Sequence, residues 1–181
     1  MRQIQIGLIV VLAWLYASTA VQAQTPATTV DEAYAPYTPL IGVWESDGGA
    51  TTQRFSWGPS RSYIEYSTTL HDANGADHLH FEGILIYNAQ TQNLDFLIAL
   101  EPGSLGQEHG TLHAEADGAI VRDIEFVGPN GAHDRFRQTY RLRSPDAGET
   151  SLMQDDGNGG WQPRFPGSDR IVMRRVSSES P

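Results

Sequence analysis

The chain has 181 residues, of which 12 are basic and 22 are acidic, and its formal net charge is −10 at pH 7. All of the basic residues are arginine, and the acidic balance argues against a nucleic-acid-binding protein, which would need a basic face. The absence of cysteine excludes disulfide bonds, a thiol nucleophile and thiolate zinc sites.

The first 23 residues have the features of a secretory signal peptide. Arg2 supplies a positive charge, residues 6–17 form an uncharged and largely apolar run, and Val21-Gln22-Ala23 offers a small-residue cleavage pattern. We expect cleavage after Ala23 and therefore a periplasmic or secreted protein. The alternative is an uncleaved anchor, but the apolar run is shorter than the ~20 residues that a membrane-spanning helix needs.

The rest of the chain is predicted to form one domain. Residues 24–29 form a polar leader that we expect to be disordered, residues 30–176 form the domain, and residues 177–181 form a polar tail. A short helix is predicted over Val30–Tyr37 at the start of the domain, and prolines at its end stop it.

The body of the domain has the pattern of an all-β protein. Turn signals rich in Gly, Asn, Asp and Pro separate short segments, many of which alternate between apolar and polar residues. These segments are Ile41–Ser46, Thr51–Trp57, Ser62–Leu70, His78–Tyr87, Asn93–Glu101, Glu108–Ala116, Ala119–Val127, His133–Arg143, Thr150–Gln154 and Arg170–Val176. About ten strands in succession predict an antiparallel up-and-down β-barrel, because closure removes exposed edges. A two-sheet sandwich is the alternative.

Two strand pairs allow the register to be predicted. In the later pair, three cross-strand partners match in charge or apolarity at once: Glu125 with Arg135, Asp123 with Arg137, and Ile124 with Phe136. The arginines of this pair therefore form an outer stripe that is either paired with acids or open to a polyanion. In the earlier pair, Asn88 faces Asn93 and Gly83 lies in the inward row, where it permits a bend.

A resemblance to a known family rests on Gly42 and Trp44, which follow the predicted helix and open the first strand. A Gly-x-Trp at this place resembles the calycin superfamily of lipocalins, fatty-acid-binding proteins and nitrobindin-like barrels. The resemblance implies that the Trp closes one barrel end beneath an Arg of the final strand, where this chain has Arg174 within Met173-Arg174-Arg175. Residues 55–66 also look like small uncharacterised bacterial exported calycin-like proteins, a resemblance that implies no activity.

The chain departs from two groups within that superfamily. Nitrobindin-like barrels carry a Gly-rich stretch after the Trp and a late His that binds haem. Here Glu45-Ser46-Asp47 follows Trp44, and no His comes after His133, so we expect no haem and no other cofactor. Lipocalins that contain disulfides are a poor match, because this chain has no cysteine.

The strongest candidate for a binding residue is Arg122. Its neighbours on the same face of the strand are apolar, so its side chain points into the barrel, with Gln138 opposite and Tyr140 one step further along. Tyr66 lies in the inward row of another strand. An unpaired buried charge is very costly, so Arg122 must meet a ligand carboxylate, pair with an internal Glu or Asp, or reach the barrel mouth.

A second candidate site is a metal site. His78, His80 and Glu82 alternate along one strand and share one side of it, and His109 and His113 share a face of another strand. Three such side chains could hold one divalent ion in a cupin-like, metal-dependent barrel enzyme. The same side chains are equally those of a solvated outer face, which is where our register places them.

The sequence as a whole favours a binding protein over an enzyme. It contains neither a Gly-x-Ser-x-Gly motif nor a cysteine nucleophile, although a barrel enzyme with an inward acid and an inward His stays open. We expect a small apolar or amphipathic ligand, with or without a carboxylate, lined by Arg122, Gln138, Tyr140 and Tyr66. The alternatives are the metal-dependent enzyme and a surface interaction module with a filled barrel. We expect no nucleic-acid partner and no membrane anchor, and the oligomeric state is left open.

Overall fold

The computed structural model describes residues 27, 29–101 and 104–177. The predicted signal peptide, almost all of the predicted leader and the tail beyond residue 177 lie outside the described residues. Within the described part of the chain, each helix is too short or too polar to cross a membrane.

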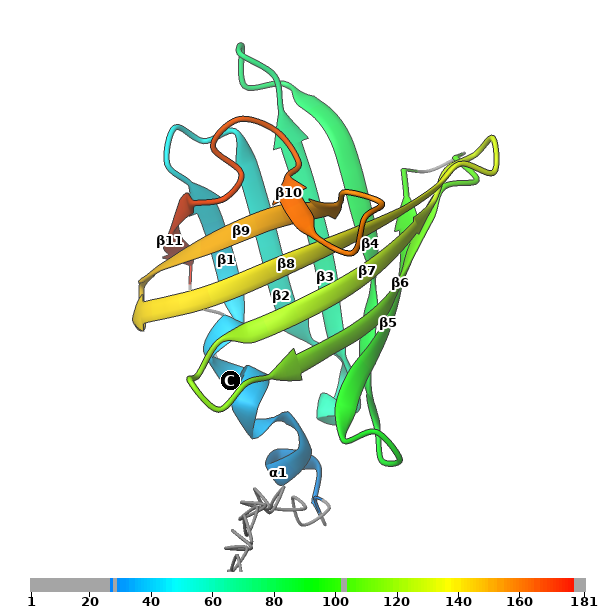
Figure 1. Cartoon of the computed structure of the whole chain (residues 1–181). Helices are drawn as coiled ribbons and strands as arrows, with labels where there is room; N and C mark the ends of the chain where they lie inside the picture. Colours follow the sequence, from blue (N-terminus) through cyan, green and yellow to red (C-terminus); the bar gives the residue numbers. More distant parts are fainter. Residues whose placement is uncertain (1–26, 28, 102–103, 178–181) are drawn as a thin grey trace, which may run out of the picture.

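The described residues form one antiparallel barrel preceded by a short helical segment (Figure 1). The helical segment consists of α1 (Val30–Tyr34) and the 3-10 helix η1 (Ala35–Leu40), and a second 3-10 turn, η2, covers Pro59–Arg61. The strands are β1 (Gly42–Ser46), β2 (Thr51–Trp57), β3 (Ile64–His71), β4 (Asp77–Asn88), β5 (Asn93–Leu100), β6 (Gln107–Ala114), β7 (Ile120–Val127), β8 (His133–Ser144), β9 (Ala147–Asp155), β10 (Trp161–Pro163) and β11 (Ile171–Ser177).

Closure of the barrel comes from the last strand. Strands β1 to β9 pair with their neighbours in chain order, and β11 pairs with both β9 and β1, which closes a ring of ten strands. The predicted up-and-down barrel is therefore confirmed, and the sandwich is wrong. Strand β10 pairs with β9 alone, beyond the segment of β9 that contacts β11. It was not predicted, because it has three residues and follows a Gly-rich turn.

The predicted registers are confirmed. Strands β7 and β8 pair Glu125 with Arg135, Asp123 with Arg137 and Ile124 with Phe136, and β4 and β5 pair Asn88 with Asn93. The outer arginines are paired with acids, for example Arg137 with Asp123 at 2.7 Å. Arg135 is an exception to simple cross-strand pairing, because its guanidinium reaches Asp155 of β9 at 3.0 Å.

Gly83 lets β4 pass close to β5 on the inner side of the barrel. A Cβ at this position would overlap the carbonyl oxygen of Leu97 and lie 2.6 Å from Cα of Ile98. Gly83 faces Tyr66 across the β3–β4 pair. The predicted inward position of this glycine is confirmed.

The helical segment plugs one end of the barrel. A capping box between Thr29 and Glu32 starts α1, and η1 extends it to Leu40, three residues beyond the predicted end, because a 3-10 helix accommodates both of its prolines. The hydroxyl of Tyr37, a buried residue, donates to the carbonyl of Leu112 at 3.2 Å. The hydroxyl of Tyr34, which is also buried, donates to the carbonyl of Ser62 at 2.8 Å.

Trp44 lies beneath an arginine of the last strand, but that arginine is Arg175 and not the predicted Arg174. The guanidinium of Arg175 is 4.6 Å from the Trp44 ring and donates to the carbonyls of Ile41 and Pro39. Alternation along β11 from the buried Met173 places Arg175 on its side of the strand and turns Arg174 outward into solvent. The prediction for Arg174 is therefore wrong by one residue.

Candidate functional site

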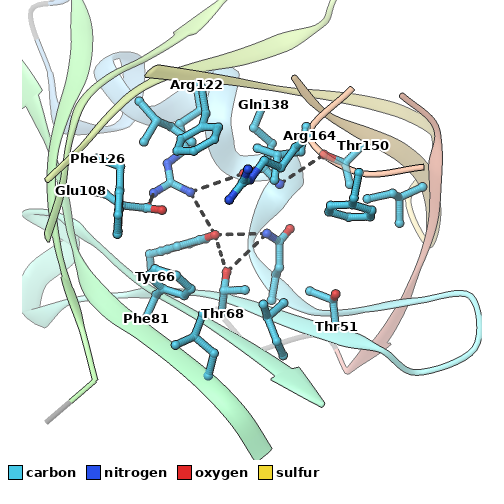
Figure 2. A pocket seen from close by; sticks show the side chains of 18 of the residues that line it. Thr51, Tyr66, Thr68, Phe81, Glu108, Arg122, Phe126, Gln138, Thr150 and Arg164 are labelled. Atoms are coloured by element: carbon cyan, nitrogen blue, oxygen red, sulfur yellow. Dashed lines mark hydrogen bonds and ion pairs between the residues drawn. The ribbon is translucent and has the colours of Figure 1, made fainter. Parts of the chain in front are cut away.

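The barrel encloses a cavity of about 360 Å³ between the plugged end and the loop that joins β10 to β11 (Figure 2). Its lining residues come from nearly all of the strands and from that loop. They are Thr51, Gln53, Tyr66, Thr68, Leu70, Leu79, Phe81, Glu108, Arg122, Ile124, Phe126, Asp134, Phe136, Gln138, Thr150, Leu152, Arg164, Phe165, Ile171 and Met173. The barrel is therefore not filled by its own side chains. The alternative of a surface interaction module assumed a filled barrel.

Arg122 is the central polar residue of the cavity wall. It projects from β7, is 3% exposed, and forms an ion pair with Glu108 of β6. Its guanidinium also lies over two aromatic rings, 4.7 Å from the ring centre of Tyr66 and 4.5 Å from that of Phe96. The sequence left three partners open for Arg122: a ligand carboxylate, an internal acid, or solvent at the barrel mouth. In the structure, Arg122 pairs with an internal acid, Glu108.

A hydrogen-bond network spreads from Arg122 across the barrel. Its Nη1 donates to the hydroxyl of Tyr66 at 3.1 Å and to Oε1 of Gln138 at 3.4 Å. The amide of Gln138 in turn donates to the hydroxyl of Thr150 at 3.3 Å. Figure 2 shows these side chains, together with Glu108, converging from opposite walls of the barrel. Strands β3, β6, β7, β8 and β9 therefore all contribute to one polar cluster.

Two further members of the cluster, Gln53 and Thr68, come from the neighbouring strands β2 and β3. The amide nitrogen of Gln53 donates to the hydroxyl of Tyr66 at 3.1 Å and to that of Thr68 at 3.3 Å, and the two hydroxyls are themselves hydrogen-bonded. Sequence reasoning missed Gln53 and Thr68. The available signal was alternation, because Gln53 lies two residues before Phe55 and Thr68 two residues after Tyr66 on inward rows.

The charge of Arg122 is maintained by its surroundings. Burial by itself lowers the pKa of a guanidinium, but the carboxylate of Glu108, together with Tyr66 and Tyr140, raises the pKa of Arg122 above its ordinary value. Arg122 is therefore positively charged at neutral pH. The cluster contains one cation and one anion in contact, so its net charge is zero.

The sequence predicted that Tyr140 lines the ligand site, but Tyr140 is not among the residues that line the cavity. It lies towards the plugged end, beside a void of about 10 Å³ that Trp44 and Phe55 also border, and its ring packs edge-on against Phe55. Burial raises the pKa of Tyr140 well above its ordinary value. Its hydroxyl and Nε of Arg122 are the two buried side-chain polar atoms without a hydrogen-bond partner among the described residues.

The candidate metal ligands lie on the outer surface. His80 contacts Thr69 at 2.9 Å and Glu82 at 3.5 Å, while His78 is exposed to solvent. In the part of the chain that the structure describes, no group of three or more His, Cys, Asp or Glu side chains is placed to hold a metal ion. His109 and His113 also lie apart, each beside a different glutamate: Glu125 and Glu115, respectively.

The mouth of the cavity differs in character from its polar cluster. Arg164, in the loop after β10, lies over the ring of Phe136 at 5.4 Å and donates to Gln154 at 3.0 Å. Apolar side chains such as Leu79 and Phe165 also line the cavity. The cavity thus has an apolar wall and a polar cluster, an arrangement that suits a ligand with an apolar body and a polar end. The sequence matches no protein-family model and no curated protein, so the role of the cavity is argued from this geometry.

Proposed function

We propose that this protein is an exported, calycin-type β-barrel that binds a small apolar or amphipathic molecule inside the barrel. The observation that carries the proposal is the cavity of about 360 Å³, with apolar walls and the polar cluster around Arg122. This volume lies near the lower end of the ~300–1,000 Å³ that is typical of small-molecule sites. The signal-peptide features of residues 1–23 support export, and the contact of Trp44 with Arg175 supports the calycin type.

The physical chemistry of the walls explains how such a ligand gains affinity. Leu70, Leu79, Phe81, Leu152 and Ile171 present apolar surface to the cavity. Each Å² of apolar surface that binding removes from water stabilises the complex by about 25 cal/mol before the costs of association are subtracted. The polar cluster adds little net energy but fixes which end of the ligand points inward.

Native mass spectrometry of the gently purified protein tests this proposal. We expect a bound organic mass of small-molecule size that Leu79→Trp removes, because an indole at this inward position fills part of the cavity. The matched control is Leu97→Trp on the outer face of β5, where the side chain is 56% exposed, and this variant should retain the ligand. An unliganded wild-type protein that also fails to take up added straight-chain alcohols and fatty acids would contradict the proposal.

A further inference from the structure

We infer that the ligand enters with an uncharged hydrogen-bond donor at its inner end, such as the hydroxyl of an alcohol, and that Glu108 accepts this hydrogen bond. The inference rests on the proposed function and specifies its ligand class. It also reverses the simplest expectation from an inward arginine, because it excludes a carboxylate at the inner end.

The first argument is the charge balance of the polar cluster. The side chains of Arg122 and Glu108 are 4% and 13% exposed, and they form an ion pair with each other. The other members of the cluster are neutral: Gln53, Tyr66, Thr68, Gln138 and Thr150. Asp134 and Arg164 add one carboxylate and one guanidinium to the cavity lining, so its charges also balance as a whole. A ligand carboxylate at the inner end would therefore bring an uncompensated negative charge next to Glu108, in a site with little water to solvate it.

The second argument is the set of acceptor atoms that have no partner. Oε2 of Glu108 bonds Arg122, whereas Oε1 has no hydrogen-bond partner among the described residues and is not sealed by protein atoms. The same holds for Oε1 of Gln53, whose amide nitrogen already donates to Tyr66 and Thr68. Both residues line the cavity. The unpartnered donor of the cluster, Nε of Arg122, is buried by protein atoms, so the two open acceptors are what a ligand meets, and they call for a donor on the ligand.

The third argument is size. A volume of about 360 Å³ corresponds to roughly twelve times the ~30 Å³ that one water molecule occupies in the liquid. Straight-chain molecules of about that many non-hydrogen atoms fit the cavity. Decanol, decanoate and decyl methyl ether are therefore suitable probes, because they share the apolar chain and differ at the polar end alone.

Isothermal titration calorimetry of the full wild-type protein with these three probes tests the inference. We expect decanol to bind about tenfold or more tightly than decanoate, because a desolvation and repulsion penalty of about 1.4 kcal/mol already gives that ratio. Decyl methyl ether, which accepts but cannot donate, should also bind more weakly than decanol. This comparison needs no substitution in the protein.

The variant Glu108→Gln tests the residue that we assign. It keeps the side-chain volume but removes the negative charge, so Arg122 becomes an unpaired cation and decanoate should gain at least about tenfold in affinity. The matched control is Glu65→Gln, at an exposed outer position of β3, which should leave all three affinities unchanged. Circular dichroism establishes that both variants are folded, and if Glu108→Gln is not, the wild-type comparison decides alone.

The outcomes separate the inference from the proposed function. If decanoate binds the wild type as tightly as decanol or more tightly, the inference is wrong while the proposed function stands. If decyl methyl ether binds as tightly as decanol, the assigned donor is likewise overturned. If none of the three probes binds, the proposed function falls together with the inference.

Discussion

Arg122 shows how a single charged residue is accommodated inside a barrel of mostly apolar side chains. Removing a guanidinium from water costs several kcal/mol, and the structure offsets this cost with one carboxylate, two aromatic faces and two neutral hydrogen-bond acceptors. The arrangement keeps the cation in one position. It also means that the two charged partners depend on each other.

A double-mutant cycle measures this dependence. Arg122→Met leaves the carboxylate of Glu108 buried without a partner, so we expect it to lower the free energy of unfolding by about 3–5 kcal/mol. Adding Glu108→Gln to Arg122→Met should recover part of that loss, because neither charge then stays unpaired. Urea unfolding of the wild type, both single variants and the double variant gives the coupling energy. Losses that simply add would contradict the mutual dependence.

The sequence predicts the position of Arg122 better than it predicts its partner. Alternation along one strand is enough to place Arg122 inward with Gln138 opposite, and the structure agrees. Glu108 was missed because it does not face Arg122: Leu112 occupies that position, and Glu108 lies four residues away on the same strand. Only the length of an arginine side chain connects them, and cross-strand register alone does not reveal such a diagonal contact.

At the scale of the elements, the plug and the last strand are joined by Arg175. This one side chain stacks on Trp44 and donates to the carbonyls of Pro39, Ile41 and Pro145, so it connects η1, β1, the β8–β9 turn and β11. Carbonyls at the end of a helical segment lack partners within the helix, and a guanidinium can satisfy several of them at once.

Substitution of the two neighbouring arginines separates the joining role from charge alone. We expect Arg175→Met to lower the free energy of unfolding by about 2–4 kcal/mol, since it removes the stacking and the hydrogen bonds to backbone carbonyls. Arg174→Met removes the same charge from an exposed position and should change stability by about 0.5 kcal/mol or less. Thermal and urea unfolding provide the comparison. Equal effects of the two substitutions would show that the contacts of Arg175 with Trp44 and the backbone carbonyls are unimportant for stability.

The limits of strand prediction have identifiable local causes. The choice between Arg174 and Arg175 depends on which face of β11 points inward, and two adjacent arginines at the end of a short strand do not reveal that face by themselves. Strand β9 begins at Ala147 and not at the predicted Thr150, because it includes Gly148, a residue type that usually signals a turn. Strand interiors with clear alternation, by contrast, were predicted closely.

At the scale of the whole molecule, closure of the barrel buries several tyrosines whose ionisation opposes folding. Burial is the main cause that raises the pKa of Tyr37 from 10.0 to about 12, and it also raises the pKa of Tyr34 and Tyr140. The chain has no lysine, so tyrosines are the side chains that titrate in this range, below the ordinary pKa of arginine. Alkaline stability is therefore a readout of the buried phenols.

We expect stability to fall as the pH rises from 10.0 towards about 12. In this range the unfolded chain loses phenol protons that the folded barrel retains, so ionisation stabilises the unfolded state. Below this range the phenols are protonated in both states, and their contribution to stability is fully present. Urea midpoints measured across the range should decline, with a shallower decline for Tyr37→Phe. A flat wild-type profile would contradict the burial of these residues.

The sequence predicts the architecture of the molecule but not its interior volume. Regular turn signals and alternating segments are sufficient for an antiparallel barrel, because they count the strands and assign their faces. The cavity depends on how completely side chains fill the ring, and this is decided by the sizes and conformations of inward side chains from many strands at once. Alternation cannot distinguish a filled barrel from a hollow one.

A crystal structure of the wild-type protein soaked with decanol tests the central claim most directly. The account predicts electron density for the alcohol inside the barrel, with its hydroxyl at hydrogen-bond distance from Oε1 of Glu108 and its chain directed towards Phe165. Decanol bound on the outer face of β4 and β5 near Ile84 and Leu97, with the interior occupied by water or by collapsed side chains, would contradict it.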